Sequence, residues 1–485
     1  MASLLTTPLE LLVAISSYLP TSDLTSLRLT CKQIERSLYE WFSQEFFTKK
    51  QFMLTHSSLQ ALIDISKHVS FSKKLSHVII ATNAYDEIPL RFRDSEAATR
   101  YIQGYEDQKV LLSTGIDREM LTEAFQGLVN LDTIGIRDFS ATSRDRDGDH
   151  ASWNSWGATT VHRETGIQLQ FSEGGNHSHD SRTGFAARIF LTVLYALGKA
   201  NRTPSHFEML LRKHHLPDST FCLPEFLRPT ADPVLQNVKT LLLNVNLDLR
   251  YFHTEGSGTS ADPHAGRSLG RFLGSTPNLT HLRLNFLKHL KANNEAFLKW
   301  LGEPILSHRP QPSPLPFLKP PPITLSSLRV LELGQINITP ISLLTAVIKF
   351  ALTLEGLSLW RMSLYPSTPS THDDKPNLWA TFFKTLSGLP QLKLKHLKVG
   401  MLQQDHMYVH FAPPADSQSI VSPHKQKEYT GREMEKFLKE LQEQVTVEWP
   451  TPIGMNDDAD EDEDEDDDDN SMDDDDDEDM LDDDE

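Results

Sequence analysis

The first fifty residues show apolar positions at helical spacing. Thr7, Pro8 and Glu10 together signal a helix start, because Thr can cap the helix, Pro fits its first turn and Glu completes a capping box. After a stop at Pro20, large apolar or sulfur side chains recur every three or four residues, at Leu24, Leu27, Cys31, Ile34, Leu38, Phe42 and Phe46. The pattern predicts a short helix ending near Pro20, followed by one long helix or by two helices broken near Thr30.

The rest of the chain repeats a short strand pattern after helical stretches. A Gly or Pro break is followed by Leu-x-x-Leu with a Leu-x-Leu core nearby, in which two Leu face inward and the middle residue faces outward. These strand cores, in which Ile or Val replaces Leu in some copies, begin at residues 78, 134, 241, 282, 331, 357 and 397. Helices are predicted within 120–125, 185–197, 341–352, 378–386 and 431–443. We expect each unit to bury its strand and its helix face only by stacking on its neighbours.

Composition separates predicted loops from predicted folded segments. Residues 140–184 are rich in Ser, Asp, Gly and His, and residues 254–268, 303–325 and 365–377 are rich in Gly, Pro or Ser, so we expect loop insertions there. The predicted organisation is a helical unit at 1–48, a body at 49–450 and a tail at 451–485. Units missed by the pattern are expected near 165–171 or 205–211.

The charge of the chain is concentrated at its C-terminus. Residues 457–485 hold 23 Asp or Glu and no Lys or Arg, within a formal net charge of −20 for all 485 residues. Without those 23, 44 of the 67 acidic side chains remain against 47 basic ones, so the rest of the chain is nearly neutral. We therefore expect no direct nucleic-acid contact by the body. The acidic segment is predicted to be disordered, and it either keeps the protein soluble or contacts basic proteins such as histones.

Cysteine content and the lengths of the apolar stretches indicate the cellular compartment of the protein. Cys31 and Cys222 are too few for a disulfide framework or a four-thiolate zinc site, which indicates a reducing compartment. The first 20 residues lack a basic segment and contain Glu10, unlike a signal peptide. No apolar stretch predicts a membrane span. We expect a soluble protein of the cytoplasm or nucleus.

Motifs for catalysis or metal binding are weak. The Asp-rich segment at 145–149 lacks the Glu that closes a calcium loop, and the His pairs at 177/179 and 214/215 lack a second spaced pair. Phosphate-binding loops, dinucleotide fingerprints and nucleophile elbows are missing. We expect no catalytic residue, no metal and no cofactor.

The N-terminal residues resemble the F-box. The resemblance is ungapped and rests on Pro8, Glu10-Leu11-Leu12, Ile15, Tyr18-Leu19-Pro20, Asp23-Leu24, Leu27-Arg28-Leu29-Thr30-Cys31-Lys32 and Ile34. An ordinary amphipathic hairpin is the alternative, because helical stripes are common. The fixed offsets of Pro, Asp-Leu and Leu-Arg-x-x-Cys-Lys favour the F-box.

Membership of that family implies that the N-terminal unit and the body bind different partners. The F-box would dock on the Skp-type linker subunit, and through it on a cullin, while the body would hold a protein substrate for ubiquitin transfer. The linker contact is expected at seven residues, some of which must serve the unit's own core: Pro8, Leu11, Leu12, Ile15, Leu19, Leu24 and Leu27.

The strand pattern of the body resembles leucine-rich repeats, which implies an irregular α/β solenoid after the all-α unit. Only the 26-residue step from 331 to 357 has the usual spacing of about 20–29 residues, so the repeats would be divergent with large insertions. An irregular α/β domain with Leu-rich strands is the alternative. The outward strand positions would form a concave substrate face with one exposed aromatic side chain, or else ordinary solvated positions: Arg283, Glu332, Ser358, Trp360 and Lys398.

Two other functions stay open. Leucine-rich repeats combined with an acidic C-terminus resemble the Ran GTPase activators, whose repeats are far more regular, so a GTPase activator or a histone-binding scaffold is the main alternative. The other is an F-box protein that works outside any ligase.

Overall fold

The structure is a computed structural model. It describes residues 4–87, 90–140, 147, 154–169, 171, 179–213, 215–247, 264–287, 291–305, 320–367, 376–412 and 424–449. The acidic segment predicted to be disordered, residues 457–485, lies outside the described residues, as do 177, 214 and most of the predicted insertions.

Three short helices form the N-terminal unit. They are α1 (Leu9–Ser17), α2 (Thr21–Thr30) and α3 (Lys32–Phe47), preceded by a 3-10 turn at Leu4–Thr6. Pro20 is extended before α2, and Cys31 is extended between α2 and α3, so the apolar stripe is carried by two helices. The predicted break near Thr30 is therefore confirmed. The unit has its own small core of Leu12, Leu24, Ile34, Leu38 and Phe46.

The body is built on one long, mostly parallel sheet. Its strands follow one another in chain order, apart from the short β5 (Leu216–Pro217), which pairs with β6: β1 (Lys49–Met53), β2 (His77–Ala81), β3 (Thr133–Arg137), β4 (His206–Leu210), β6 (Thr240–Asn246), β7 (His281–Phe286), β8 (Val330–Gly334), β10 (Gly356–Trp360), β12 (His396–Gly400) and β15 (Gln426–Thr430). Only β15 is antiparallel to its neighbour. All seven predicted strand cores fall within these strands, and β4 is the unit suspected near 205–211.

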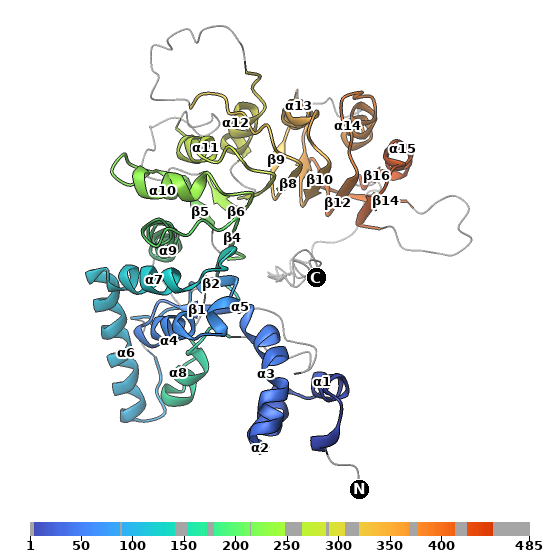
Figure 1. Ribbon diagram of the computed structural model, residues 1–485. Coiled ribbons are helices and arrows are strands. Elements are labelled where there is room, and N and C mark those ends of the chain that lie inside the picture. Colours follow the sequence, from blue (N-terminus) through green and yellow to red (C-terminus); the bar gives the residue numbers. More distant parts are fainter. Residues whose placement is uncertain are drawn as a thin grey trace, which may run out of the picture.

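Helices cover one side of this sheet. In Figure 1 they follow the outer side of an arc, while the strands line its inner side. The helices are α4 (His56–Lys67), α5 (Phe71–Lys74), α6 (Ser95–Thr114), α7 (Ile116–Gly127), α8 (Ala158–Thr165), α9 (His179–Lys199), α10 (Arg228–Leu235), α11 (Arg267–Gly274), α12 (Lys291–Leu301), α13 (Pro340–Phe350), α14 (Leu378–Ser387) and α15 (Met434–Gln444). The five predicted helical stretches all overlap helices of this set.

The expected class, mixed α/β, is confirmed. The prediction of loops was wrong for part of the insertions, since α8 and the start of α9 lie within 140–184 and α11 begins within 254–268. Polar composition hid these helices, because α8 buries only Thr165, and the large buried side chains of α9 and α11 lie beyond residues 184 and 268. A second, smaller sheet lies at the C-terminal end of the body, with strands in the order β16 (Val445–Val447), β14 (Met407–Phe411), β13 (Gln403–Gln404), β11 (Ser363–Leu364) and β9 (Asn337–Ile338).

Side-chain alternation along the strands decides which residues enter the core. The second and fourth positions of the central strands face the helices and are buried, as Leu282 and Leu284 are in β7. They join a large apolar cluster that extends from Phe52 to Val445. The first, third and fifth positions face the opposite side, called the inner face below.

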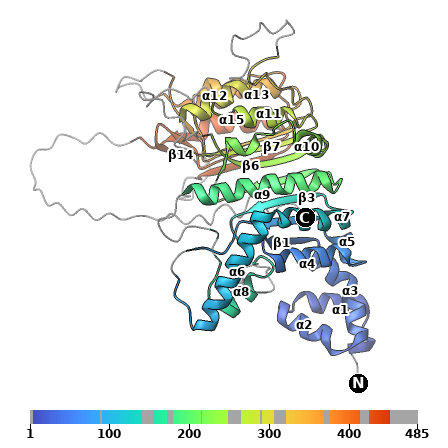
Figure 2. The same cartoon turned by 90° about the vertical axis from the view of Figure 1, so that its left-hand side faces the viewer.

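Aromatic side chains join the N-terminal unit to the body. Figure 2 shows α1, α2 and α3 projecting from one end of the array, next to α5. Phe47, at the end of α3, packs against both core clusters and stacks on Phe71 of α5 with ring centroids 3.9 Å apart. His68 stacks on Phe71 in turn, at 4.0 Å. Side-chain packing therefore holds the N-terminal unit to the body, in addition to the covalent connection between them.

A carboxylate from the body caps the second helix of the unit. Asp147 accepts hydrogen bonds from the backbone N of Thr21 and from its Oγ1, each at 2.7 Å. No residue next to α2 supplies a side-chain cap, so Asp147 satisfies a free backbone N–H from 126 positions away. This contact adds a second tie between the unit and the body.

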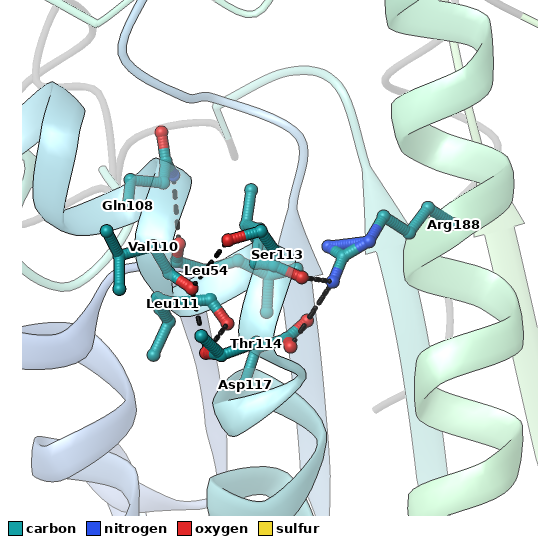
Figure 3. Close-up of polar contacts among 9 residues, drawn as sticks. Leu54, Gln108, Val110, Leu111, Ser113, Thr114, Asp117 and Arg188 are labelled. Atoms are coloured by element: carbon teal, nitrogen blue, oxygen red, sulfur yellow. Dashed lines mark hydrogen bonds and ion pairs between the residues drawn. The ribbon is translucent and has the colours of Figure 1, made fainter.

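A buried ion pair fixes the helices of the first half of the body. As Figure 3 shows, Arg188 of α9 reaches to α6 and α7, where its Nη2 donates to the carbonyl oxygen of Leu112 at 2.6 Å and to Asp117 Oδ2 at 3.0 Å. Asp117 is fully buried, and that burial raises its pKa while the charge of Arg188 opposes the shift. Gln108 of α6 donates to the Leu54 carbonyl oxygen at 2.9 Å, which attaches α6 to the end of β1.

Candidate protein-binding surfaces

The N-terminal unit exposes large apolar side chains. Leu11 is 56% exposed, Ile15 48% and Tyr18 86%, and Leu9 and Leu29 are exposed as well. Exposed apolar side chains on so small a unit indicate a partner that covers them. We call the set Leu9, Leu11, Ile15, Tyr18 and Leu29 the docking patch.

The structure divides the seven residues predicted to contact the linker. Pro8, Leu11 and Ile15 are exposed, and Leu19 and Leu27 are partly buried against the small core. Leu12 and Leu24 are buried inside that core, so the prediction that they contact a partner was wrong. The physical reason is that a unit with so few apolar side chains needs both Leu for its own core.

The geometry of α1 explains why the sequence left this division open. Leu12 and Ser16 are one helical turn apart and face inward. Leu11 and Ile15 have the same spacing and face outward. Both stripes contain leucine, so the pattern alone does not tell the buried one from the exposed one.

Leu9, Tyr18 and Leu29 of the docking patch were not among the predicted contact residues. Tyr18 and Leu29 belong to the residues that resemble the F-box, but no contact is predicted for them, and Leu9 does not belong to those residues. Tyr18 and Leu29 are large apolar side chains off the helical stripe, and that position is the signal that would have found them.

The inner face of the sheet forms the second candidate surface. A groove of about 620 Å³ runs along it, lined from β1 to β15. Its charged lining residues are the four histidines His77, His206, His281 and His396, the bases Lys49, Arg137, Arg283 and Lys398, and the carboxylates Glu208, Glu332 and Glu428. We call this surface the inner groove.

The residues predicted for a substrate face are brought together by strand register. At the third strand position, Arg283 of β7 opposes Glu332, Glu332 opposes Ser358, and Ser358 opposes Lys398 of β12. All four line the inner groove. Their predicted orientation is confirmed, whereas their role in binding stays a prediction.

Trp360 lies on the same face but is not an exposed aromatic residue, contrary to the prediction. It is 9% exposed, at the fifth position of β10, between Gly334 and Gly400 of the neighbouring strands. Its ring lies over Gly400, where an added Cβ would come 2.1 Å from the indole. The glycine lets the indole lie flat on the sheet, which buries it. Among the described residues, Trp360 Nε1 has no hydrogen-bond acceptor.

Each carboxylate in the inner groove lies near one histidine and near one Lys or Arg side chain. Glu208 Oε2 is 3.4 Å from His77 Nε2 and 3.8 Å from Arg137 Nη2. Glu332 is 2.5 Å from His281 Nε2 and 4.0 Å from Arg283 Nε. Glu428 is 3.9 Å from His396 Nε2 and 3.5 Å from Lys398 Nζ. The same three-group cluster therefore occurs three times along the groove.

Burial and these neighbours shift the pKa values of Glu332 and His77. Burial opposes ionisation of Glu332, but the hydrogen bond and charge of His281 and the charge of Arg283 outweigh it and lower its pKa. Burial lowers the pKa of His77 well below 6.5, and the charges of Lys49, Arg137 and His206 act in the same direction. Glu208 is close to His77 but does not reverse that shift.

The four histidines were not among the predicted site residues. Each occupies the first position of its strand, directly before the first buried residue, as in His281-Leu282 and His396-Leu397. The sequence does contain this signal, since His precedes a strand core four times. The predicted strand pattern rests on the inward apolar positions alone and does not include the residue before them.

Comparisons with known proteins leave the family open. Neither the models of known protein families nor the curated proteins contain a match to this chain. In the described ranges, no three His, Cys, Asp or Glu side chains are grouped so that they could hold a metal ion. None of the described helices is long and apolar enough to cross a membrane.

Proposed function

We propose that this protein is the substrate-recruiting subunit of a Skp–cullin–F-box ubiquitin ligase in the cytoplasm or nucleus. In this proposal α1, α2 and α3 are the F-box, and the body is a divergent leucine-rich-repeat solenoid. The observation that carries it is the docking patch. Its apolar side chains lie on a three-helix unit whose sequence resembles the F-box and whose core is already closed without them.

The proposed mechanism is proximity. The docking patch binds the Skp-type linker, the linker holds the unit on the cullin, and the body holds a substrate protein near the ubiquitin-loaded enzyme. Binding thereby raises the local concentration of the substrate lysine without any bond being made or broken by this chain.

The attachment of the unit to the body supports this mechanism. A recruiting subunit must present its substrate at a defined distance and angle. The stack of Phe47 on Phe71 and the cap that Asp147 gives to Thr21 join the two parts on two sides. A chain joined only by a flexible linker would lack both contacts.

The main alternative is a GTPase activator of the Ran type or a histone-binding scaffold. It rests on the composition of residues 457–485 and on the repeat-like strands. The docking patch favours the ligase subunit, because neither alternative explains an apolar surface on the N-terminal helices.

Affinity purification from cells tests the proposal. Wild-type protein is expected to retain the Skp-type linker, the cullin and substrates. The double substitution Leu11→Asp and Ile15→Asp should lose the linker and cullin. A matched control is Ile348→Asp with Leu352→Asp, since these residues are also exposed, apolar and four positions apart, but lie on the outer side of the body.

Four outcomes are informative. Loss in the first variant and retention in the control support the proposal. Normal retention of the linker by the first variant, with an unchanged melting temperature, contradicts it. Retention of the linker without the cullin indicates an F-box protein outside a ligase, and stimulation of a GTPase by wild-type protein supports the alternative.

A further inference from the structure

The inner groove has an excess of basic groups. Its lining contains four Lys or Arg against three carboxylates, and each of those carboxylates already contacts two basic groups. The four histidines add positive charge only when they are protonated, and burial lowers the pKa of His77. A ligand that brings further carboxylates would meet basic groups along the whole length of the sheet. A basic ligand would have to compete with the groove's own cations for three carboxylates.

An apolar cluster interrupts the charges near the middle of the inner face. Phe139, Leu210 and Leu242 pack together there. The guanidinium groups of Arg212 and Arg137 lie 4.0 and 5.4 Å from the centroid of the Phe139 ring. The surface therefore suits a segment that is mainly acidic and carries a few large apolar side chains.

The chain itself contains such a segment. Residues 457–485 combine 23 Asp or Glu with Met472, Met480 and Leu481. Their attachment point lies at the β15 end of the body, because Trp449 follows β16, β16 pairs with β14, and β14 is bridged to the residues just before β15 through Phe411 and His424. β15 is the last strand of the sheet that lines the groove.

The connecting chain is long enough to reach all of the groove. Ten strands at about 4.8 Å spacing give a sheet about 43 Å wide. The 36 residues from 450 to 485 extend to about 120 Å at about 3.3 Å per residue. Even as a random coil they span about 33 Å on average.

We propose that the acidic residues 457–485 dock in the inner groove of their own chain and compete there with acidic segments of other proteins. Tethering gives the segment an effective concentration on the order of 1 mM, so a weak contact is enough to occupy the groove. Charge–charge contacts at this surface are screened by salt, which makes occupancy sensitive to ionic strength. The inference stands independently of the ligase proposal, because it uses only the groove and the segment.

The test is a competition with a labelled peptide of residues 457–485, followed by fluorescence anisotropy. One protein is the full wild-type chain. The other is the full chain in which each of the 23 acidic residues from 457 to 485 is replaced by its amide, Asp→Asn or Glu→Gln. We expect the peptide to bind this neutral-tail chain about tenfold more tightly than wild type, because only the neutral-tail chain leaves the groove empty.

Substitutions in the neutral-tail chain locate the binding surface. Lys49→Gln with Lys398→Gln should weaken peptide binding about fivefold or more, since both lysines line the inner groove. These lysines are preferred to Arg137 and Arg283, whose burial makes their loss a risk to folding. Lys299→Gln with Lys436→Gln is the matched control, because these lysines are exposed on α12 and α15 and lie outside the groove lining.

The outcomes separate the proposal from non-specific attraction. Weaker binding in the groove variant alone, and weaker binding of the peptide as salt rises from 0.05 to about 0.3 M, support it. Equal affinity of the peptide for wild-type and neutral-tail chains would show that residues 457–485 do not occupy the groove of their own chain, which overturns the proposal. The groove could then bind only acidic segments of other proteins. An equal loss in the groove variant and the matched control also overturns the proposal.

Discussion

The docking patch and the inner groove are both open surfaces, but they differ in chemistry. The docking patch is apolar and lies on a unit with a core of five buried residues. The inner groove is charged and lies on a body whose core runs from Phe52 to Val445. Covering apolar surface stabilises a complex, whereas the charged groups of the groove are already paired with one another when the groove is empty. The first surface suits a lasting partner and the second suits partners that exchange.

The two surfaces also differ in how much their supporting structure tolerates change. In the N-terminal unit, contact and core residues alternate on the same short helices. In the body, the strand pleat separates the groove from the core. Substitutions that disturb one function without the other are therefore easier to find in the body.

The largest expected effect is unfolding of the N-terminal unit by Leu24→Asp. Leu24 is fully buried, and an unpaired carboxylate there costs several kcal/mol, enough to unfold a unit of this size. Hydrogen exchange should show loss of protection in α1, α2 and α3, while the body stays protected. Protection in those helices equal to wild type would show that Leu24 is not part of a core. Linker binding should be lost as a consequence of unfolding.

Removal of the ion pair in the body comes next. Arg188→Ala leaves Asp117 buried without its partner, and we expect a loss of about 3 kcal/mol in the free energy of unfolding. Lys67→Ala removes the exposed pair with Glu123 and should cost less than about 1 kcal/mol. Chemical denaturation of both variants checks the difference. Equal costs would mean that the buried pair is not a structural contact.

Trp360 tests the packing of the inner face. Trp360→Ala removes a large buried side chain and should destabilise the body by about 3 kcal/mol. Gly400→Ala forces the indole away and should cost about 1–3 kcal/mol, whereas Gly388→Ala places its Cβ no closer than 3.4 Å to another atom and should cost less. Thermal unfolding measures all three. If Trp360→Ala leaves stability unchanged, the indole is not packed on Gly400.

The smallest effect expected is a pH dependence of stability from His77. Its pKa is lowered in the folded protein, so below pH 6.5 the unfolded chain binds the proton more readily than the folded one. Stability from this group is therefore complete above pH 6.5 and falls as the pH decreases. The melting temperature of His77→Gln should decline less than that of wild type between pH 7 and pH 5.5. Identical slopes would contradict the lowered pKa.

Much of the body could be predicted because its strands are specified by inward leucines. Leu282 with Leu284 and Leu357 with Leu359 fix both the strand and the side of the sheet that each neighbour occupies. The orientation of Arg283 and Ser358 followed from that alternation. The burial of Trp360 did not, because it depends on Gly400 in the next strand, 40 positions away along the chain.

The N-terminal unit was less completely predicted, for a different reason. Its helices and their break at Cys31 follow from local signals. The roles of Leu11 and Leu12 depend on which side of α1 faces α3, and both sides carry leucine. The cap from Asp147 also lies beyond any local signal, since it comes from a polar segment that composition marks only as a loop.

The central claim is that the docking patch binds the Skp-type linker, and a direct titration of the purified proteins by calorimetry tests it. Wild-type protein and the Ile348→Asp with Leu352→Asp control should bind the linker with equal affinity and one-to-one stoichiometry. Leu11→Asp with Ile15→Asp should remain folded and bind at least about 100-fold more weakly, because two charges would enter an apolar contact. Wild-type protein that does not bind the linker, or a folded double variant that binds it as wild type does, would contradict the account.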